Sequence, residues 1–420
     1  MTASDQYNKA FDTEKPTRVA TADGRSRPLV VLQVLPALIE GDVGRSCIDV
    51  AFALAQAGGT PLVASSGGAL VRELDRAGLA HFFLPLDRQD PWDVWRNGRR
   101  LTEIAREMGV DILHARGLGP AWSGRQAARA AGCRFVTTLH TADRIERKRR
   151  DRNMTTLLRN ERAIAVSDYL RNYFLTEFSI PPEHIITVPR SIDTTLFAPE
   201  RVTQARLVKL AAQWRLPEDR VIILCPAPLE QRFGQIDLIE AIARIQRNDL
   251  CCLILGQEPA LQRDFQRKLE KRIEELDLTN TVHLVDQCPD LPAAYMLATV
   301  VVSPSREPEA FCRVCAEALA MERPVIVSAH GAAAEVAEPG PTVWLTPPAD
   351  PTRLAEALEQ ALSLNPAHRA ALAEPARRRV SERFHRNILC SGTLRVYLDL
   401  MAESPPNEQR ASKLNFFKIS

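Results

Sequence analysis

Two series of short apolar runs, with amphipathic stretches between the runs, restrict the fold of this chain most strongly. A run that is apolar on both faces and ends at Gly, Pro, Ser or a polar turn is typical of a strand buried in a parallel sheet. Helical stretches such as 47–58 and 97–109 separate the runs, as they do in doubly wound folds. The runs are 29–36, 60–66, 81–86, 111–116, 134–140, 163–167 and 184–189, then 221–227, 251–256, 282–287, 299–305, 324–329 and 343–347.

The sequence therefore predicts an α/β fold with two Rossmann-like, doubly wound parallel-sheet domains facing a central cleft. Segment 196–220 lacks strand character, and the join falls there. The predicted organisation is a disordered tail over 1–27, an N-terminal domain over 28–195, a C-terminal domain over 196–380, a C-terminal helix over 381–402 that packs back on the N-terminal domain, and a flexible tail over 403–420.

Composition points to a cytoplasmic protein without a nucleic-acid partner. The formal net charge of +2 creates no strong field that would attract nucleic acid. No apolar run approaches the roughly 18 residues that span a bilayer, and the polar N-terminus has no signal-peptide core. The nine cysteines are scattered, which favours reduced thiols. Cys312 and Cys315 form a C-x-x-C without a companion pair, so we expect a structural pair and no metal site.

Segment 305–324, SREPEAFCRVCAEALAMERP, combines a predicted strand end, a turn and a helix start. From residue 311 the apolar positions 311, 314, 315, 318 and 319 form the stripe of a helix with one buried face. Glu309 precedes this helix, and Glu317 falls about 120° from the stripe at 100° per residue. The two acids therefore do not form a dyad on one helical face. They suit the hydroxyls at two ends of one ligand, with the first-turn amides facing an anion such as a diphosphate. The plainer alternative is that both carboxylates are solvated.

The segment resembles the E-x7-E motif of the GT-B retaining glycosyltransferases of the bacterial family 4 type. The resemblance covers about residues 29–400 through consecutive blocks. GDVGRSCIDVAFALAQAGGTPLVAS is similar to the glycine-rich first loop and helix of that family, VTTLHTADR to its T-x-H segment, and IPPEHIITVPRSIDTTLF to its linker block. AAYMLATVVVSPSREPEAF and ERPVIVSAHGAAAEV resemble blocks of its second domain.

The resemblance implies a metal-independent glycosyltransferase without a cofactor, which uses a UDP- or GDP-linked sugar as donor and a glycan or lipid-linked acceptor. The product would keep the anomeric configuration, in polysaccharide or lipopolysaccharide synthesis. It implies that His140 and Glu309 act at the donor sugar and that Glu317 holds the ribose. The other donor-binding residues that it implies are Phe311, Cys312, Arg313, Gly41 and Arg232.

Several residues depart from the family pattern at the expected phosphate site. The Arg and Lys of the family's diphosphate clamp fall on Pro228 and Phe233, with Arg232 one position away as a stand-in. Asp42 follows Gly41 where a second glycine is usual, and Arg190 stands where Asn is frequent. These departures leave open a degenerate, weakly active or inactive relative that binds a nucleotide sugar or a partner enzyme. A third alternative is a GT-B sugar-nucleotide epimerase.

A basic stretch over residues 144–152 could contact anionic lipid headgroups, although such a run is more often a solvated face. Trp92 and Trp95, beside Arg96, Arg99 and Arg100, would add interfacial anchors. We therefore expect a cytoplasmic protein with peripheral contact at the inner face of the membrane.

Overall fold

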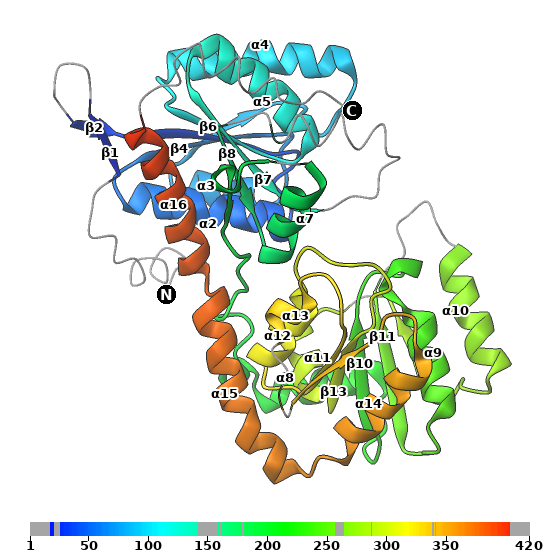
Figure 1. Cartoon of the computed structure of the whole chain (residues 1–420). Helices are drawn as coiled ribbons and strands as arrows, with labels where there is room; N and C mark the ends of the chain where they lie inside the picture. Colours follow the sequence, from blue (N-terminus) through cyan, green and yellow to red (C-terminus); the bar gives the residue numbers. More distant parts are fainter. Residues whose placement is uncertain are drawn as a thin grey trace. The chain divides into compact units, whose positions relative to one another are not determined.

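The apolar runs form the strands of two separate parallel sheets, as the sequence predicted (Figure 1). The chain divides into unit 1, which comprises Met1–Ser191 and Arg386–Ser420, and unit 2, which comprises Ile192–His385. The computed structural model describes residues 17–20, 26–141, 158, 161–178, 180–256, 264–286, 288–337, 340 and 342–403.

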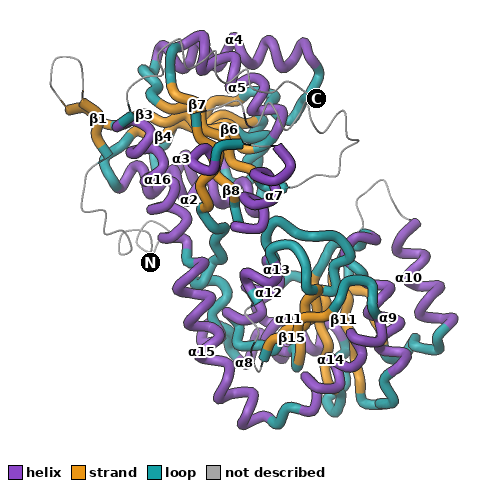
Figure 2. The backbone as a smooth tube through the Cα atoms, in the orientation of Figure 1, coloured by secondary structure: helices purple, strands orange, loops and turns teal. Residues whose placement is uncertain are grey.

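Unit 1 contains a seven-stranded sheet in the order β5-β4-β3-β6-β7-β8-β9, in which all neighbouring strands are parallel. Figure 2 shows α4 and α5 on one side of this sheet and α2 on the other. The strands are β3 (Val30–Val34), β4 (Thr60–Ser65), β5 (Ala80–Phe83), β6 (Ile112–Arg116), β7 (Arg134–Leu139), β8 (Arg162–Ala165) and β9 (Ile185–Thr187). The helices are α2 (Asp42–Gln56), α3 (Val71–Arg76), α4 (Pro91–Glu107), α5 (Leu118–Ala131), α7 (Asp168–Phe178) and α16 (Arg386–Ala402), with the 3₁₀ turn η1 (Pro182–His184).

Unit 2 contains a six-stranded parallel sheet in the order β12-β11-β10-β13-β14-β15. The strands are β10 (Val221–Pro226), β11 (Leu250–Leu255), β12 (Val282–Val285), β13 (Val300–Ser303), β14 (Val325–Ser328) and β15 (Val343–Thr346). The helices are α8 (Gln204–Trp214), α9 (Gln235–Arg244), α10 (Asp264–Glu275), α11 (Leu291–Leu297), α12 (Arg313–Ala320), α13 (Ala333–Val336), α14 (Pro351–Ser363) and α15 (Pro366–Phe384), with 3₁₀ turns η2 (Pro199–Arg201) and η3 (Gln231–Phe233).

Strands that are buried on both faces explain the continuous apolar runs. Successive residues of a strand point to opposite faces, so one strand contributes to two cores. In β10, Leu224 packs in the cluster that α11, α12 and α15 cover, whereas Ile223 packs in the cluster that α9 and α14 cover. Both side chains are fully buried. Hydrophobic burial on both faces therefore holds each sheet between layers of helices.

The ends of unit 1 differ from the organisation that the sequence suggested. β1 (Arg18–Ala20) pairs antiparallel with β2 (Ser26–Pro28), inside the segment 1–27 that we expected to be a disordered tail. The chain passes from one unit to the other after Ser191 and after His385, where the sequence suggested boundaries at 195 and 380.

The helix α16 belongs to unit 1, although the whole of unit 2 precedes it in the chain. Its Leu389, Cys390 and Leu394 join a cluster with Val31 of β3 and Val50 of α2. The His114 ring nitrogen Nδ1 lies 2.6 Å from the Tyr397 hydroxyl, which ties α16 to β6. None of the helices in the described part of the chain combines the length and apolar content that crossing a membrane requires.

Candidate functional site

The carboxyl ends of β10 and β13 form the point in unit 2 where a ligand is expected. These two strands are neighbours in the sheet, but the chain leaves β10 toward β11 on the opposite side. Loops that diverge from such a topological switch point leave a crevice, where open α/β sheets bind their ligands. The loops here are 227–234 and 304–312, and they carry most of the residues that the sequence selected in this unit.

The two loops are tied to each other by their backbones. The Arg306 amide donates to the Arg232 carbonyl at 2.7 Å. Gly234 has φ of +71°, and a Cβ atom at this position would lie 1.9 Å from the Pro304 carbonyl oxygen. Glycine is therefore required here both for the backbone conformation and for the close approach of the second loop.

Glu309 lies on the loop after β13, half-buried, with its position set by the neighbouring chain. The Ser305 hydroxyl donates to Glu309 Oε1 at 2.5 Å, and the Ala332 amide donates to the Glu309 carbonyl at 2.9 Å. His330 Nε2 lies 2.7 Å from the Ser305 carbonyl, which holds the segment after β14 against the same loop. The Ser305 hydroxyl thus orients the carboxylate, and the segment after β14 holds the backbone that carries it, as a ligand-binding group requires.

Glu317 is buried on α12, although the apolar stripe of that helix placed it outside the buried face. Its side chain is only 6% exposed. Oε2 accepts a hydrogen bond from the Tyr295 hydroxyl at 2.8 Å, and Arg313 Nε lies 3.4 Å from Oε1. The pKa of Tyr295 is raised by burial and by the adjacent Glu317 carboxylate. A tyrosine donor from α11 therefore lets this carboxylate lie inside the unit.

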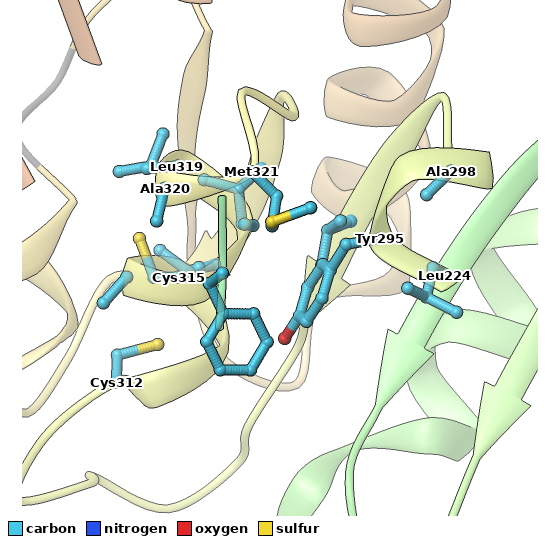
Figure 3. Packing of buried hydrophobic residues seen from close by; sticks show 14 of the residues in the cluster. Leu224, Tyr295, Ala298, Cys312, Cys315, Leu319, Ala320 and Met321 are labelled. Carbon is cyan, nitrogen blue, oxygen red and sulfur yellow. The ribbon is translucent and has the colours of Figure 1, made fainter. Parts of the chain in front are cut away.

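The side chains of Phe311 and Cys312 belong to the core of unit 2. Phe311 packs edge-to-face on Phe384 with ring centroids 5.3 Å apart. Figure 3 shows Cys312 and Cys315 on one side of the same buried cluster and Tyr295 on the other. Both thiols are free and buried, and the pKa of Cys312 is raised by a hydrogen bond with Cys315 and by burial. Only the backbone at 311 and 312 is left for a ligand.

The helix α12 begins at Arg313, two residues later than the apolar stripe suggested. Cys312, with ψ of 83°, is the non-helical residue that precedes it. The Arg313 side chain is exposed at the surface, whereas Cys312 before it is buried. The first-turn amides of α12 therefore start at Arg313, whose own N–H donates to the Phe311 carbonyl at 3.1 Å.

Arg232, the predicted stand-in for the missing clamp, is a surface residue with a local partner. Its Nε donates to Glu230 Oε2 at 2.8 Å, and its guanidinium lies 4.4 Å from the centre of the Phe233 ring. Its side chain is 51% exposed. Pro228 is also exposed, and the buried Gln235 side chain donates to its carbonyl at 2.7 Å. The Gln235 side chain thus holds the backbone of this loop, while Arg232, its basic residue, is exposed to solvent.

In unit 1, Gly41 has φ of +134° at the residue before α2, a conformation that favours glycine. Asp42 follows it and accepts from Arg190 Nη1 at 2.7 Å. Arg190 Nη2 donates to the His140 carbonyl at 3.1 Å and lies 3.4 Å from His140 Nδ1. Two departures from the family pattern, Asp42 and Arg190, are therefore partners in one ion pair that also contacts the predicted histidine.

His140 follows β7 and is held as a neutral ring. Burial, with the positive charges of Arg190 and Arg116, lowers its pKa well below the usual value. Its Nε2 atom is buried and has no hydrogen-bond partner among the described residues. A neutral imidazole with one nitrogen unused can donate to or accept from a ligand hydroxyl.

Sequence reasoning missed the residues that support these side chains. They are Tyr295 and Ser305, which donate to the two carboxylates, and the Arg306–Asp237 pair, in which Arg306 Nε and Nη2 each lie 2.6 Å from an Asp237 oxygen. Each is an ordinary residue in its local pattern, so no signal marks it before the strands are placed side by side. Residues 144–152, the predicted membrane contact, lie outside the described residues.

Two family models match consecutive parts of the chain. The model of Glycosyltransferase Family 4 matches residues 43–196, and the model of glycosyl transferases group 1 matches residues 209–379. Together they span most of the folded part of both units.

Curated relatives carry the names of glycosyltransferases. The chain is 30% identical over 239 residues to the MMP alpha-(1->4)-mannosyltransferase of Mycolicibacterium hassiacum, covering 56% of this chain and 53% of that protein. It is 23% identical over 269 residues to the lipopolysaccharide 1,2-N-acetylglucosaminetransferase of Salmonella typhimurium, covering 59% of this chain and 66% of that protein. The match therefore spans less than two thirds of either relative.

Solved structures match over almost the whole chain. A glycosyltransferase from Rickettsia africae is 28% identical with a TM-score of 0.82, covering 90% of this chain and 100% of that one. Anabaena HepE in complex with UDP is 20% identical with a TM-score of 0.77, covering 88% of this chain and 100% of that one. The family models, the relatives and the fold agree, and the chain belongs to the GT-B glycosyltransferases of the family 4 type.

Proposed function

We propose that this protein transfers a sugar from a UDP- or GDP-linked donor to a glycan or lipid-linked acceptor, with retention and without a metal. The observation that carries the proposal is the pair of oriented carboxylates, Glu309 and Glu317, on either side of the start of α12 at the switch point of unit 2. Complexes of Anabaena HepE with UDP and with UDP-glucose, which share the fold, support a nucleotide-sugar donor.

In this proposal Glu317 binds the ribose hydroxyls and Glu309 the sugar hydroxyls. The backbone amides at Phe311 and Cys312 face the diphosphate, and Arg313, whose own amide donates to the Phe311 carbonyl at 3.1 Å, lies next to them in the chain. The acceptor oxygen forms a bond to the anomeric carbon on the face from which the diphosphate leaves, and the carbon–oxygen bond to the phosphate breaks. The acceptor proton passes to the leaving phosphate oxygen, so no protein nucleophile is needed. The chain supplies hydrogen bonds and positive charge to the developing diphosphate.

His140 and Gly41 are proposed to serve the same reaction, on the strength of the family resemblance. The neutral state of His140 suits a hydrogen bond to a sugar hydroxyl. The relatives named as a mannosyltransferase and a lipopolysaccharide N-acetylglucosaminetransferase support an acceptor in polysaccharide or lipopolysaccharide synthesis.

One observation favours a second candidate, a weakly active relative that binds a nucleotide sugar. Pro228 and Phe233 occupy the clamp positions, and the nearby Arg232 is paired with Glu230. Loss of one contact to a transition-state charge costs about 2.7–4 kcal/mol, or on the order of a hundredfold in rate.

Nucleotide release from a panel of UDP- and GDP-sugars separates the two candidates. The enzyme releases nucleotide with at least one donor and a glycan acceptor extract. Glu317→Ala weakens donor binding, while the control Glu359→Ala, on the exposed face of α14, does not. Binding without release in the natural chain, together with release in a Pro228→Arg/Phe233→Lys variant, would establish the weakly active candidate. Unchanged donor affinity in Glu317→Ala contradicts the placement of the ribose.

We also propose a cytoplasmic location with peripheral contact at the inner face of the membrane. Besides residues 144–152, the support is a pair of stacked tryptophans on α4, Trp92 and Trp95, which are 62% and 41% exposed. Arg99 lies over the Trp95 ring at 5.1 Å. Exposed tryptophan beside arginine suits a headgroup layer. Co-sedimentation with anionic vesicles tests this: we expect loss of binding in Trp92→Ser/Trp95→Ser, and equal binding by this variant contradicts the role of α4.

A further inference from the structure

Two arginines meet at the switch point of unit 2, and the sequence singled out only one of them. Arg232 lies on the loop after β10, and Arg306 lies on the loop after β13. Their backbones are joined by the hydrogen bond from the Arg306 amide to the Arg232 carbonyl. The backbones of the two arginines are therefore adjacent at the edge of the sheet where the ligand of an open α/β fold binds.

Arg306 is held in a defined orientation. Its Nε and Nη2 atoms each lie 2.6 Å from one oxygen of Asp237, in the first turn of α9. The Asp237 side chain is 5% exposed, whereas that of Arg306 is 31% exposed. A guanidinium carries five N–H donors, and this side-on pair uses two of them. The remaining donors lie on the part of the group that is away from Asp237.

The charges at this edge are balanced by local acids. Arg306 is paired with Asp237, and Arg232 is paired with Glu230. An anion that binds here gains hydrogen bonds from the guanidinium groups but is repelled by the two carboxylates. The carboxylate that orients an arginine therefore also weakens the attraction of that arginine for a phosphate.

We propose that Arg306 binds the diphosphate of the nucleotide-sugar donor, in place of the clamp that Pro228 and Phe233 do not provide, and that Asp237 positions it. This inference rests on the proposed function, because it requires a nucleotide donor. Arg306 acts on the phosphates alone, so it distinguishes a nucleoside diphosphate from the corresponding nucleoside. Arg232 contributes the second, more exposed guanidinium.

Calorimetric titration with UDP and uridine, and with GDP and guanosine, tests the proposal on the whole chain. We expect Arg306→Met to weaken binding of the diphosphate about 10- to 100-fold, the usual effect of losing a charge-assisted hydrogen bond. Binding of the nucleoside stays within about twofold. Asp237→Asn keeps one oxygen acceptor but breaks the two-point contact that positions Arg306, and we expect a smaller loss of diphosphate binding than in Arg306→Met, with nucleoside binding unchanged. This selective loss for the diphosphate separates a phosphate ligand from a purely structural ion pair.

Three outcomes overturn the proposal. Equal losses for diphosphate and nucleoside, in Arg306→Met or in Asp237→Asn, show a structural role only. Unchanged UDP and GDP binding in Arg306→Met refutes this inference and leaves the proposed function intact. If the natural chain binds neither nucleoside diphosphate, the proposed function fails as well. Arg306→Lys serves if Arg306→Met does not fold: it keeps the charge, and we expect a smaller loss that grows with added salt.

Discussion

His114 lies in β6 with no exposed surface, and both of its ring nitrogens contact hydroxyl groups. Nδ1 lies 2.6 Å from Tyr397 and Nε2 lies 2.7 Å from Thr138. Burial, together with the charge of Arg116, lowers the pKa of this ring well below its usual value. The folded protein therefore keeps His114 neutral, whereas the unfolded chain takes up a proton near pH 6.5.

The sign of the effect follows from proton binding. Below pH 6.5 the unfolded state binds a proton that the folded state does not, so the free energy of unfolding falls as the pH falls. Between pH 7.5 and pH 5.5 the loss from this one ring is about 1.4 kcal/mol. The loss continues until the pH reaches the lowered pKa of the folded state.

We expect a His114→Gln variant to be less stable than the natural chain at pH 7.5, and the difference to shrink by about 1.4 kcal/mol at pH 5.5. Denaturant unfolding measures this in a Trp214→Phe/Trp344→Phe background. The remaining tryptophans then lie in α4 and α5 and report on unit 1.

Tyr397→Phe is the matched control, because it removes a partner of His114 but leaves the titrating ring in place. We expect its destabilisation to be nearly the same at both pH values. If the natural chain and His114→Gln also differ by the same free energy of unfolding at pH 7.5 and pH 5.5, the folded protein does not lower the pKa of His114. That result would refute the prediction.

Two further substitutions test particular contacts. Gly234→Ala should destabilise unit 2 by about 2 kcal/mol or more, because it adds strain at positive φ and a clash with the Pro304 carbonyl. Hydrogen exchange of the β10 amides measures this loss. The control Gly132→Ala, with positive φ but nothing within 4 Å, should destabilise unit 1 by less, as measured by exchange of the β7 amides. Arg190→Met should raise the pKa of His140 in an NMR titration of the ring, since burial and then the Arg190 charge lower it; an unchanged pKa would remove Arg190 from the explanation, and Arg190→Lys should restore the low value.

The fold could be predicted because each sheet is buried on both faces, which leaves a repeated apolar pattern in the sequence. Exact helix starts could not, since they depend on single residues: Cys312 has a non-helical ψ that its apolar character does not reveal. Glu317 shows the limit of helical periodicity. Its position outside the apolar stripe indicated a side chain that faces away from the core, but a hydroxyl from Tyr295 satisfies the buried carboxylate.

Contacts between segments that are distant in the chain could not be predicted from the sequence either. Asp237 and Arg306 are 69 residues apart, and only the pairing of β10 with β13 places their loops together. The same holds for Asp42 and Arg190, 148 residues apart. In the sequence, Asp42 and Arg190 were two unrelated departures from the family pattern. The structure shows that they form an ion pair, so their charges neutralise each other.

The discontinuous make-up of unit 1 has a consequence for the order in which this protein is made. A ribosome completes the whole of unit 2 before it adds α16, the last piece of the unit 1 core. Domains generally fold as units during synthesis, with the N-terminal one first, but here unit 2 is the first unit whose sequence is finished. Until Tyr397 and Leu394 emerge, the apolar surface around Val31 and Val50 lacks its cover. A released chain that ends before residue 386 would therefore contain all of unit 2 and leave this apolar surface of unit 1 uncovered.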